Sequence, residues 1–391
     1  SSNGIEKFPK LRFPEFKEPW NLVKLEDVCS HRKGRAKVKK AQYISTENIL
    51  QNYAGIEPYD DLSEAEGISI QCGDTLMANI RPYLKKVWQS NFNGACSTDV
   101  IAFSPDNIDG KFLYFLIAQD RFVNYVMCGA KGSKMPRGDK NHILEYETGV
   151  PTESEQRKIA HFIDLLNARI SSQNSLINLI KKYKRGSLSA LFPKKREITP
   201  QYRFAGFTKP WEQRKAKELF VSTADKGYPE LPVLSATQDR GMIRRDENSI
   251  NIFHDKKNEA GYKRVLPGQF VIHLRSFQGG FAYSAIEGIT SPAYTVFGFS
   301  EPEKHDSEYW KYVFTSKSFI RRLETVTYGI RDGRSISYEE FLTLGFVYPS
   351  KAEQTAIARC LDKLSDLITL HQHKYDTLLS LKNAILQQMF I

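Results

Sequence analysis

Two long stretches of the chain carry apolar residues in alternating steps of three and four, the spacing of a coiled-coil helix. The pattern begins at Ile159 in residues 152–192 and returns at Ile357 in residues 350–391. It predicts one helix in each stretch, packed along an apolar seam against a partner helix. The predicted seam consists of Ile159, Ile163, Leu166, Ile170, Ile177, Ile180, Ile357, Leu361, Leu364, Ile368, Tyr375 and Leu378.

The two predicted helices begin in the same way. Thr152 is followed three residues later by Glu155, and Ser350 is followed by Glu353, with a proline directly before each hydroxyl residue. This is the capping-box pattern, in which the glutamate side chain bonds back to the amide of the hydroxyl residue. At about 1.5 Å per residue, about forty residues span on the order of 60 Å. We therefore interpret the helices as spacers, with ordinary core helices as the alternative.

The remaining chain is also repeated. An Arg-Phe-x-x-Phe-x-x-Pro-Trp pattern begins at Arg12 and again at Arg203, and we interpret it as an aromatic anchor at the entrance of a domain. Strand-like segments bounded by Gly, Pro and Ser, such as residues 99–103 and 294–299, predict β-rich globular parts. The predicted fold is α+β: two β-rich domains separated by two long antiparallel coiled-coil helices, in a pseudo-two-fold internal repeat.

The composition favours a polyanionic partner. The formal charge is +11 and the isoelectric point is near 9.2, which points first to nucleic acid and second to a membrane surface. No apolar run reaches the roughly eighteen residues that span a bilayer. The five cysteines lack zinc-ligand or redox spacing, so we expect reduced, mostly buried thiols in a cytoplasmic protein. Ser1–Gly4 is typical of residues left by an expression vector.

Motifs of catalysis are missing from the sequence. It contains no Walker-type phosphate loop, paired-histidine zinc helix, Gly-x-Ser-x-Gly elbow or dinucleotide fingerprint. The Asn-Pro-Pro-Tyr or Asp-Pro-Pro-Tyr segment expected of amino-group DNA methyltransferases is missing too. We therefore predict no catalytic residue and no metal site in this chain.

Basic and aromatic residues in predicted loops are the positive signal. Arginine can bond two acceptors on a guanine edge, and glycine lets the backbone approach a phosphate closely. The alternatives are a flexible solvated loop for residues 31–40, and pairing of the other arginines with a local carboxylate such as Asp139 or Asp332. The DNA-binding candidates are Arg32, Lys33, Arg35, Lys37, Arg81, Tyr83, Lys85, Lys131, Ser133, Lys134 and Arg137 in the first repeat, and Arg275, Gln278, Tyr328, Arg331, Arg334 and Ser335 in the second.

Together these motifs resemble the specificity (S) subunit of type I restriction-modification systems, over nearly the whole chain. The resemblance rests on Gly73-Asp74-Thr75-Leu76, Ile80-Arg81-Pro82-Tyr83-Leu84, Cys96-Ser97-Thr98-Asp99, Gly132-Ser133-Lys134-Met135-Pro136-Arg137 and the helix start after Pro151. It implies a leader (1–10), target recognition domain 1 (11–151), a central spacer helix (152–192), a linker (193–201), target recognition domain 2 (202–349) and a distal spacer helix (350–391).

The resemblance also implies a division of labour. This chain would recognise a bipartite target in double-stranded DNA without catalysing a reaction. Two methyltransferase subunits would dock on the helices and motor-nuclease (restriction) subunits would join them. No cofactor would bind to this chain; S-adenosylmethionine, ATP and Mg would bind to the partner subunits. The alternatives are a free-standing DNA adenine methyltransferase and a non-specific coiled-coil scaffold.

Overall fold

The computed structural model describes residues 7–194, 197–237, 240–247, 256–273, 280–323, 327–328 and 335–391, and for residues 256–257, 327–328 and 335–336 it describes the backbone alone. The chain folds into two compact units. Unit 1 comprises residues 1–175 and 373–391, and unit 2 comprises residues 176–372. Each unit therefore contains the globular part of one repeat together with segments of both long helices. The linear domain limits given above stay a prediction.

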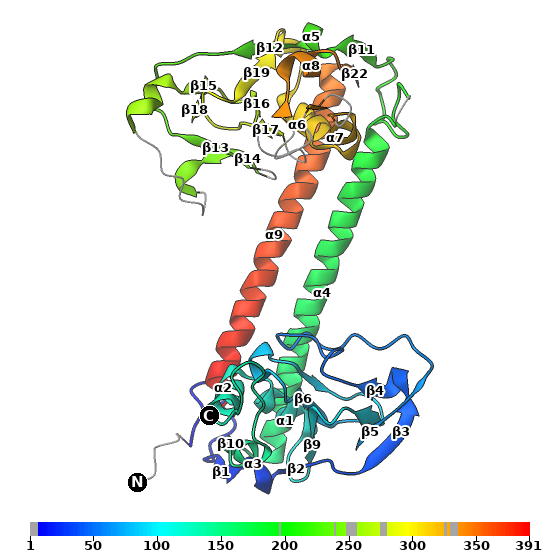
Figure 1. Cartoon of the computed structure of the whole chain (residues 1–391), viewed down its shortest axis with the longest axis vertical. Helices are drawn as coiled ribbons and strands as arrows, with labels where there is room; N and C mark the ends of the chain where they lie inside the picture. The colour runs from blue at the N-terminus through cyan, green and yellow to red at the C-terminus, as the bar shows by residue number, and fades with distance from the viewer. Residues whose placement is uncertain are drawn as a thin grey trace. The chain divides into compact units, whose positions relative to one another are not determined.

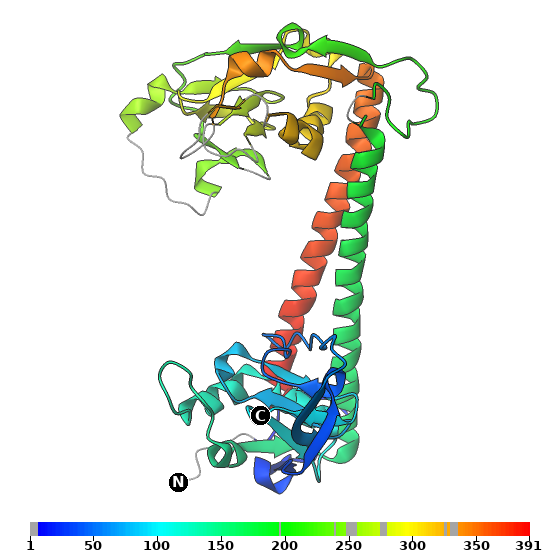
Figure 2. The ribbon, with the colours of Figure 1, turned by 45° about the vertical axis from the view of Figure 1, so that its right-hand side comes forward.

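The two long helices are α4 (Glu153–Leu191) and α9 (Lys351–Met389), each of 39 residues. In unit 1, Ile159 near the start of α4 lies in one core with Met389 at the end of α9. In unit 2, Leu191 at the end of α4 lies in one core with Ile357 near the start of α9. The helices therefore pair in antiparallel fashion, as the green and red ribbons of Figures 1 and 2 show.

The positions of the predicted seam lie on the less exposed side of both helices. Lys184, which interrupts the apolar pattern, donates a hydrogen bond from Nζ to Ser365 Oγ at 2.7 Å, so this polar position meets a polar partner. Burial and the nearby Lys311 lower the pKa of Lys184. Of the seam positions, Ile159, Ile163, Ile170, Ile177, Ile357 and Leu361 are buried, and Leu166, Ile180, Leu364, Ile368, Tyr375 and Leu378 are half-buried.

Unit 1 is built around two four-stranded sheets. One has the order β2-β9-β6-β7 and is antiparallel, and the other has the order β3-β5-β8-β4. Apolar side chains such as Leu76, Cys96 and Val100 form a core of their own, and Phe103, Phe112 and Phe122 join the larger core with the helices. The elements are β1 (Asn21–Lys24), β2 (Cys29–His31), β3 (Arg35–Lys39), β4 (Tyr43–Ile44), β5 (Glu64–Ile70), β6 (Thr75–Ala78), β7 (Val87–Gln89), β8 (Gly94–Cys96), β9 (Val100–Pro105), α1 (Gly110–Ile117), α2 (Asp120–Cys128), α3 (Lys140–Leu144) and β10 (Glu147–Val150), which pairs with β1.

Unit 2 repeats this plan. Its four-stranded sheet has the order β12-β19-β16-β17, which matches β2-β9-β6-β7 strand for strand, and the pair β11-β22 matches β1-β10. The chain is thus α+β with two β-rich units and paired long helices. The elements are β11 (Glu212–Lys215), α5 (Ala216–Leu219), β12 (Phe220–Thr223), β13 (Leu234–Thr237), β14 (Gly241–Arg244), β15 (Lys263–Val265), β16 (Phe270–Ile272), β17 (Phe281–Tyr283), β18 (Gly288–Thr290), β19 (Thr295–Phe299), α6 (Ser307–Thr315), α7 (Lys317–Leu323), β20 (Thr327–Tyr328), β21 (Ser335–Ile336), α8 (Tyr338–Leu342) and β22 (Gly345–Tyr348).

The glutamates at the helix starts have a different role from the predicted one. The Glu155 carboxylate accepts hydrogen bonds from Arg12 Nε at 2.7 Å and Arg12 Nη2 at 2.8 Å. In unit 2, Glu353 accepts equivalent bonds from Arg203 at 2.8 and 2.7 Å. The capping-box prediction for these side chains is wrong, because a two-pronged, charge-assisted bond to arginine is stronger than a bond to one amide.

Two further predictions need correction. Residues 35–39 form strand β3 rather than a loop, because β5 lies opposite and carries Glu64 and Glu66 as partners for its cations. The free cysteines are also less buried than predicted: Cys29 and Cys96 are buried, while Cys72 and Cys128 are exposed.

Candidate functional site

Two of the segments singled out in the sequence meet at one end of strand β6 in unit 1. Beyond the strand, Arg81 N donates a hydrogen bond to Pro136 O at 2.8 Å. Ile80 and Arg137 form an antiparallel bridge next to this bond. Residues 79–86 and 131–138, which are about fifty positions apart in the sequence, thus form one continuous surface.

The loop of residues 131–138 is a closed turn. Lys131 and Arg137 exchange two backbone hydrogen bonds, each of 2.9 Å. Gly132 adopts φ +96°, a left-handed conformation that costs little for glycine. Between the bonded ends, Ser133, Lys134 and Met135 are exposed to solvent. The backbone of this loop is therefore fixed, and its side chains are available to a ligand.

Arg81 lies at the centre of this surface. Its backbone has φ 53°, which is unfavourable for a residue with a side chain. Its Nε is buried and has no hydrogen-bond partner among the described residues. Tyr83, two residues further on, is exposed. A buried donor without a partner is costly, so Arg81 is a strong candidate for a ligand contact.

Three candidate cations pair with nearby carboxylates. Lys85 lies 2.8 Å from Asp120, and Lys131 lies 2.7 Å from Asp139. The bond to Asp139 raises the pKa of Lys131 and lowers the pKa of Asp139. Arg137 Nη2 lies 3.1 Å from Asp99 Oδ1. The local pairing considered as an alternative is therefore present. Exposed ion pairs of this kind contribute only about 0–1 kcal/mol, so an incoming phosphate can replace such a carboxylate.

The basic segment 32–40 is largely neutralised by the protein. Arg32 donates two hydrogen bonds to the Asp74 carboxylate, from Nε at 2.9 Å and from Nη2 at 3.0 Å, and the Asp74 side chain is only 1% exposed. Arg32 therefore holds the turn before β6. Strand β3 places Arg35 3.0 Å from Glu66 and forms an ion pair between Lys37 and Glu64. Lys33 is exposed, and no ion pair is described for it.

The candidates of the second repeat fall mostly outside the described residues. Arg275, Gln278, Arg331 and Arg334 lie in the segments 274–279 and 329–334, which are not described. The backbones of Tyr328 and Ser335 pair between the antiparallel strands β20 and β21, but their side chains are likewise outside the description. This pairing corresponds to the Lys131–Arg137 pairing of unit 1.

Sequence reasoning missed a third segment at the same surface. Asn52 N donates to Leu84 O at 3.1 Å and Tyr53 N donates to Lys85 O at 2.9 Å, which ties residues 51–55 to the turn after Arg81. The signal in the sequence was the polar, glycine-ended run Gln51-Asn52-Tyr53-Ala54-Gly55. Because such runs occur in many solvent-exposed turns, this one could not be singled out by its residues alone.

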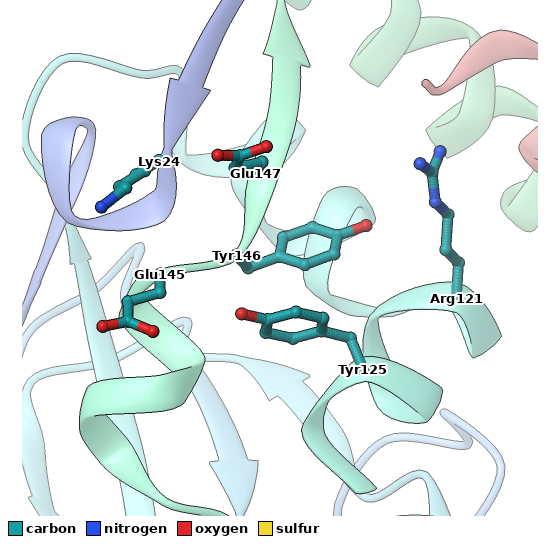
Figure 3. Close-up of a pocket in the computed structure, with 6 residues that line it drawn as sticks. All are labelled: Lys24, Arg121, Tyr125, Glu145, Tyr146 and Glu147. Atoms are coloured by element: carbon teal, nitrogen blue, oxygen red, sulfur yellow. The ribbon is translucent and has the colours of Figure 1, made fainter. Parts of the chain in front are cut away.

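Unit 1 also contains an open pocket of about 630 Å³. Figure 3 shows the rings of Tyr125 and Tyr146 in the middle of this pocket, with Glu145 on one side and Arg121 on the other. Burial raises the pKa of both tyrosines. Among the hydrogen bonds described for the six lining side chains, Tyr125 donates from its hydroxyl to His142 O at 3.1 Å, and none links two lining side chains. The remaining lining residues are Lys24 and Glu147.

The described residues carry neither a cluster of metal ligands nor a candidate membrane-spanning helix. No group of three or more His, Cys, Asp or Glu side chains there could hold a metal ion. None of the helices in the described part of the chain combines the length and apolarity needed to cross a membrane.

The sequence comparisons give a consistent family. Residues 17–182 match the family model for the Type I restriction modification DNA specificity domain. The chain is 21% identical to the type I restriction enzyme MjaVIII specificity subunit of Methanocaldococcus jannaschii, over 97% of this chain and 94% of that protein. It is 22% identical to the EcoDI specificity subunit of Escherichia coli, over 45% of this chain and 41% of that protein.

Solved structures share the fold. An S subunit from M. genitalium superimposes with a TM-score of 0.60 at 13% identity, covering 98% of this chain and 99% of that one. The HsdS subunit from Thermoanaerobacter tengcongensis gives 0.52 at 17% identity, covering 96% and 98%. A chain from a study of complex assembly and conformational transition of the type I R-M system gives 0.59 at 16% identity, again covering 96% and 98%.

The comparisons place residues 17–182 with the DNA specificity domains of type I restriction modification systems. The chain as a whole is similar to specificity subunits of type I restriction-modification systems.

Proposed function

We propose that this chain reads a bipartite target in double-stranded DNA, with each unit reading one half-site. The observation that carries the proposal is the surface at the end of β6, where Arg81 and the closed loop 131–138 converge. It combines cations for phosphate, an arginine with an unpartnered donor and exposed side chains on a fixed backbone. Unit 2 has the same strand order, which supports a second reader of the same kind.

The proposed contacts divide by chemistry. Arg81 is the candidate for a guanine edge, because an arginine guanidinium can bond both guanine acceptors. Lys33, Lys85, Lys131 and Lys134 are candidates for phosphate. Arg32, Arg35 and Lys37 are bound to protein carboxylates, so we assign them a structural role. The other candidates are Tyr83, Ser133 and Arg137 in unit 1, and Arg275, Gln278, Tyr328, Arg331, Arg334 and Ser335 in unit 2.

The chain also positions partner subunits in this proposal. Two methyltransferase subunits would use S-adenosylmethionine, and motor-nuclease subunits would use ATP and Mg. In support, α4 carries the apolar side chains Leu176, Leu179 and Tyr183 at helical spacing, exposed and off the seam. Exposed apolar residues in a row are typical of a protein interaction site. The similarity to a chain studied for complex assembly of the type I R-M system is consistent with such partners.

Replacing the globular part of the second repeat tests the proposal of a bipartite target. Residues 202–349 are replaced by the corresponding segment of another specificity subunit, and both chains select targets from a random duplex library. The expected result is a change in one half of the selected sequence and retention of the other half. A change in both halves, or in neither, would contradict the assignment of one half-site to each unit.

The two other readings make different predictions. A free-standing adenine methyltransferase would transfer methyl groups to DNA as the purified chain alone. A non-specific scaffold would select no sequence from the library.

Arg81→Ala should relax the preference at one base of one half-site by about 1–3 kcal/mol. Equal weakening on all sequences would assign Arg81 to phosphate.

A further inference from the structure

The segment of residues 51–55 carries two exposed amide side chains next to the proposed DNA surface of unit 1. We infer that Asn52, together with Gln51, reads an adenine edge in the half-site of unit 1. This inference rests on the proposed DNA-reading function and adds a specific residue, a specific base and a third segment to it.

Backbone contacts fix the segment in place. Asn52 and Tyr53 donate their amides to the carbonyls of Leu84 and Lys85 at 3.1 and 2.9 Å. The turn that receives these bonds begins at Arg81, whose own amide is bonded to the loop 131–138. Three separate segments of unit 1 are thereby joined by hydrogen bonds into one surface, and residues 51–55 form one side of it.

Left-handed backbone is concentrated at this surface. The described residues other than glycine with positive φ are Asn52 (55°), Tyr53 (60°), Arg81 (53°) and Lys85 (54°). All four lie in the two segments that are bonded to each other. Such conformations are unfavourable for residues with a Cβ and persist where the surroundings enforce them, most often at functional sites. A structural turn could have used glycine at these positions without this strain.

Asp120, the first residue of α2, bonds to side chains of two of these segments. Its Oδ1 accepts a hydrogen bond from the Tyr53 hydroxyl at 3.1 Å and lies 2.8 Å from Lys85 Nζ. Tyr53 is half-buried and packs against the main core of unit 1. Tyr53 and Lys85 are therefore tied down by their side chains. Gln51 and Asn52 are exposed, and no side-chain hydrogen bond of either is described.

The chemistry of the exposed groups selects the base. A carboxamide presents one donor and one acceptor, which match the N7 acceptor and the N6 donor of adenine in the major groove. The neighbouring Arg81 and Lys134 supply positive charge for guanine or phosphate. The Asn52 amide is therefore suited to select adenine. Because its backbone is held in place, it loses less entropy on binding than a flexible amide would.

The test separates recognition from folding. Asn52→Gly removes the amide and keeps a residue that tolerates positive φ, so thermal stability should be unchanged or slightly higher. The full chain and the variant first select targets from a random duplex library. We expect the variant to lose its preference for adenine at one position of one half-site by about tenfold. Asn91→Gly removes an exposed amide from a bend of unit 1 outside these three segments and should leave the preference unchanged.

A change in the DNA identifies the atom. Each adenine of the selected half-site is replaced in turn by 7-deazaadenine, which lacks the N7 acceptor. Wild-type binding should weaken at one position, and the Asn52→Gly variant should show no further loss there. Asn52→Asp, of equal size, should lose the preference at the same position and serves if the glycine variant fails to fold.

The possible outcomes are distinct. A sequence-specific wild type whose base preference is retained in both Asn52 variants, or which is indifferent to every 7-deaza substitution, would overturn this inference and leave the proposed function standing. A wild type without sequence preference would overturn both.

Discussion

Arg12 and Arg203 begin the repeated aromatic motif, and each places its guanidinium on a buried glutamate at the start of a long helix. Glu155 is only 1% exposed and also accepts a bond from Trp20 Nε1 at 3.3 Å. The Arg35–Glu66 pair has similar bond lengths but lies in solvent. Burial of the carboxylate, rather than the pairing itself, therefore decides how much an ion pair contributes to stability.

Removal of one buried partner should destabilise its own unit. Arg12→Ala leaves the Glu155 carboxylate buried without its main partner, so we expect a loss of about 3–5 kcal/mol in the unfolding of unit 1. Arg203→Ala should have the same effect in unit 2. Chemical denaturation followed by hydrogen exchange in each unit measures this loss. Arg35→Ala is the control and should cost less than about 1 kcal/mol. Equal losses in the buried and exposed variants would contradict the argument from burial.

The stability of unit 1 should also depend on His31. Burial and the nearby Lys140 and Lys33 lower its pKa from 6.5 to about 4, so the folded state holds it neutral. Its Nε2 is buried without a described partner, which fits a neutral ring. The unfolded chain takes up a proton below pH 6.5. The contribution of His31 is therefore complete above pH 6.5 and is lost as the pH falls towards 4.

The variant His31→Gln isolates this effect, because glutamine does not titrate. Melting temperatures of both proteins are compared between pH 6.5 and about 4. The wild type should lose more stability than the variant across this window. Parallel curves would show that His31 has an ordinary pKa in the folded protein.

At the scale of elements, each long helix ends on the globular part of the other repeat. Phe390, directly after α9, stacks on Phe112 of unit 1 with ring centroids 5.1 Å apart. Phe192, directly after α4, stacks on Tyr309 of unit 2 at 5.3 Å. Backbone hydrogen bonds also join each helix end to the other repeat. Leu11 N donates to Gln388 O, and Tyr202 N donates to Ala190 O, each at 3.0 Å. The repeats therefore exchange their helix ends.

This exchange predicts an effect in the opposite repeat. Phe390→Ala empties a buried site in unit 1, and we expect unit 1 to lose about 3–5 kcal/mol although the mutation lies in the second repeat. Phe192→Ala should act on unit 2. Hydrogen exchange of β1 and β10 amides, compared with β11 and β22 amides, measures the two effects separately. Destabilisation of the globular part in the same repeat as the mutation would contradict the exchange.

At the scale of the whole molecule, one chain carries two units whose four-stranded sheets share one strand order. Unit 1 carries the half-buried Arg81, the exposed Tyr83 and the exposed residues 131–135 at the end of β6. The second repeat has Arg275 but no Arg-Pro-Tyr triplet at the corresponding place. The common sheet order provides the scaffold and the loops differ in sequence, which suits the two half-sites of the proposed function.

The proposed partner surface on α4 can be tested without disturbing the fold. Leu179 is 62% exposed, so Leu179→Glu should change stability by no more than about 0.5 kcal/mol. It should prevent stable association with the methyltransferase subunits, as measured by co-purification of the full complex. Asn178→Glu adds the same charge on another face of α4 and is the control. Normal assembly of the Leu179→Glu variant would rule out this surface.

The α+β class and the paired helices followed from the sequence because they depend on periodicity. The heptad spacing from Ile159 and from Ile357 was sufficient, since an apolar stripe on a long helix requires a partner. The roles of polar side chains could not be predicted in the same way. Glu155 was assigned to a cap and Arg32 to phosphate, because their partners Arg12 and Asp74 are remote in the sequence.

The sequence by itself thus determined what local pattern and internal repeat encode. These are two β-rich parts, two long helices and a set of motifs that resemble one family. Tertiary structure alone decided which cations are neutralised, which helix end packs on which unit and that residues 51–55 join the surface of Arg81. These outcomes depend on contacts between segments far apart in the chain, and burial sets their energy. No local pattern contains that information.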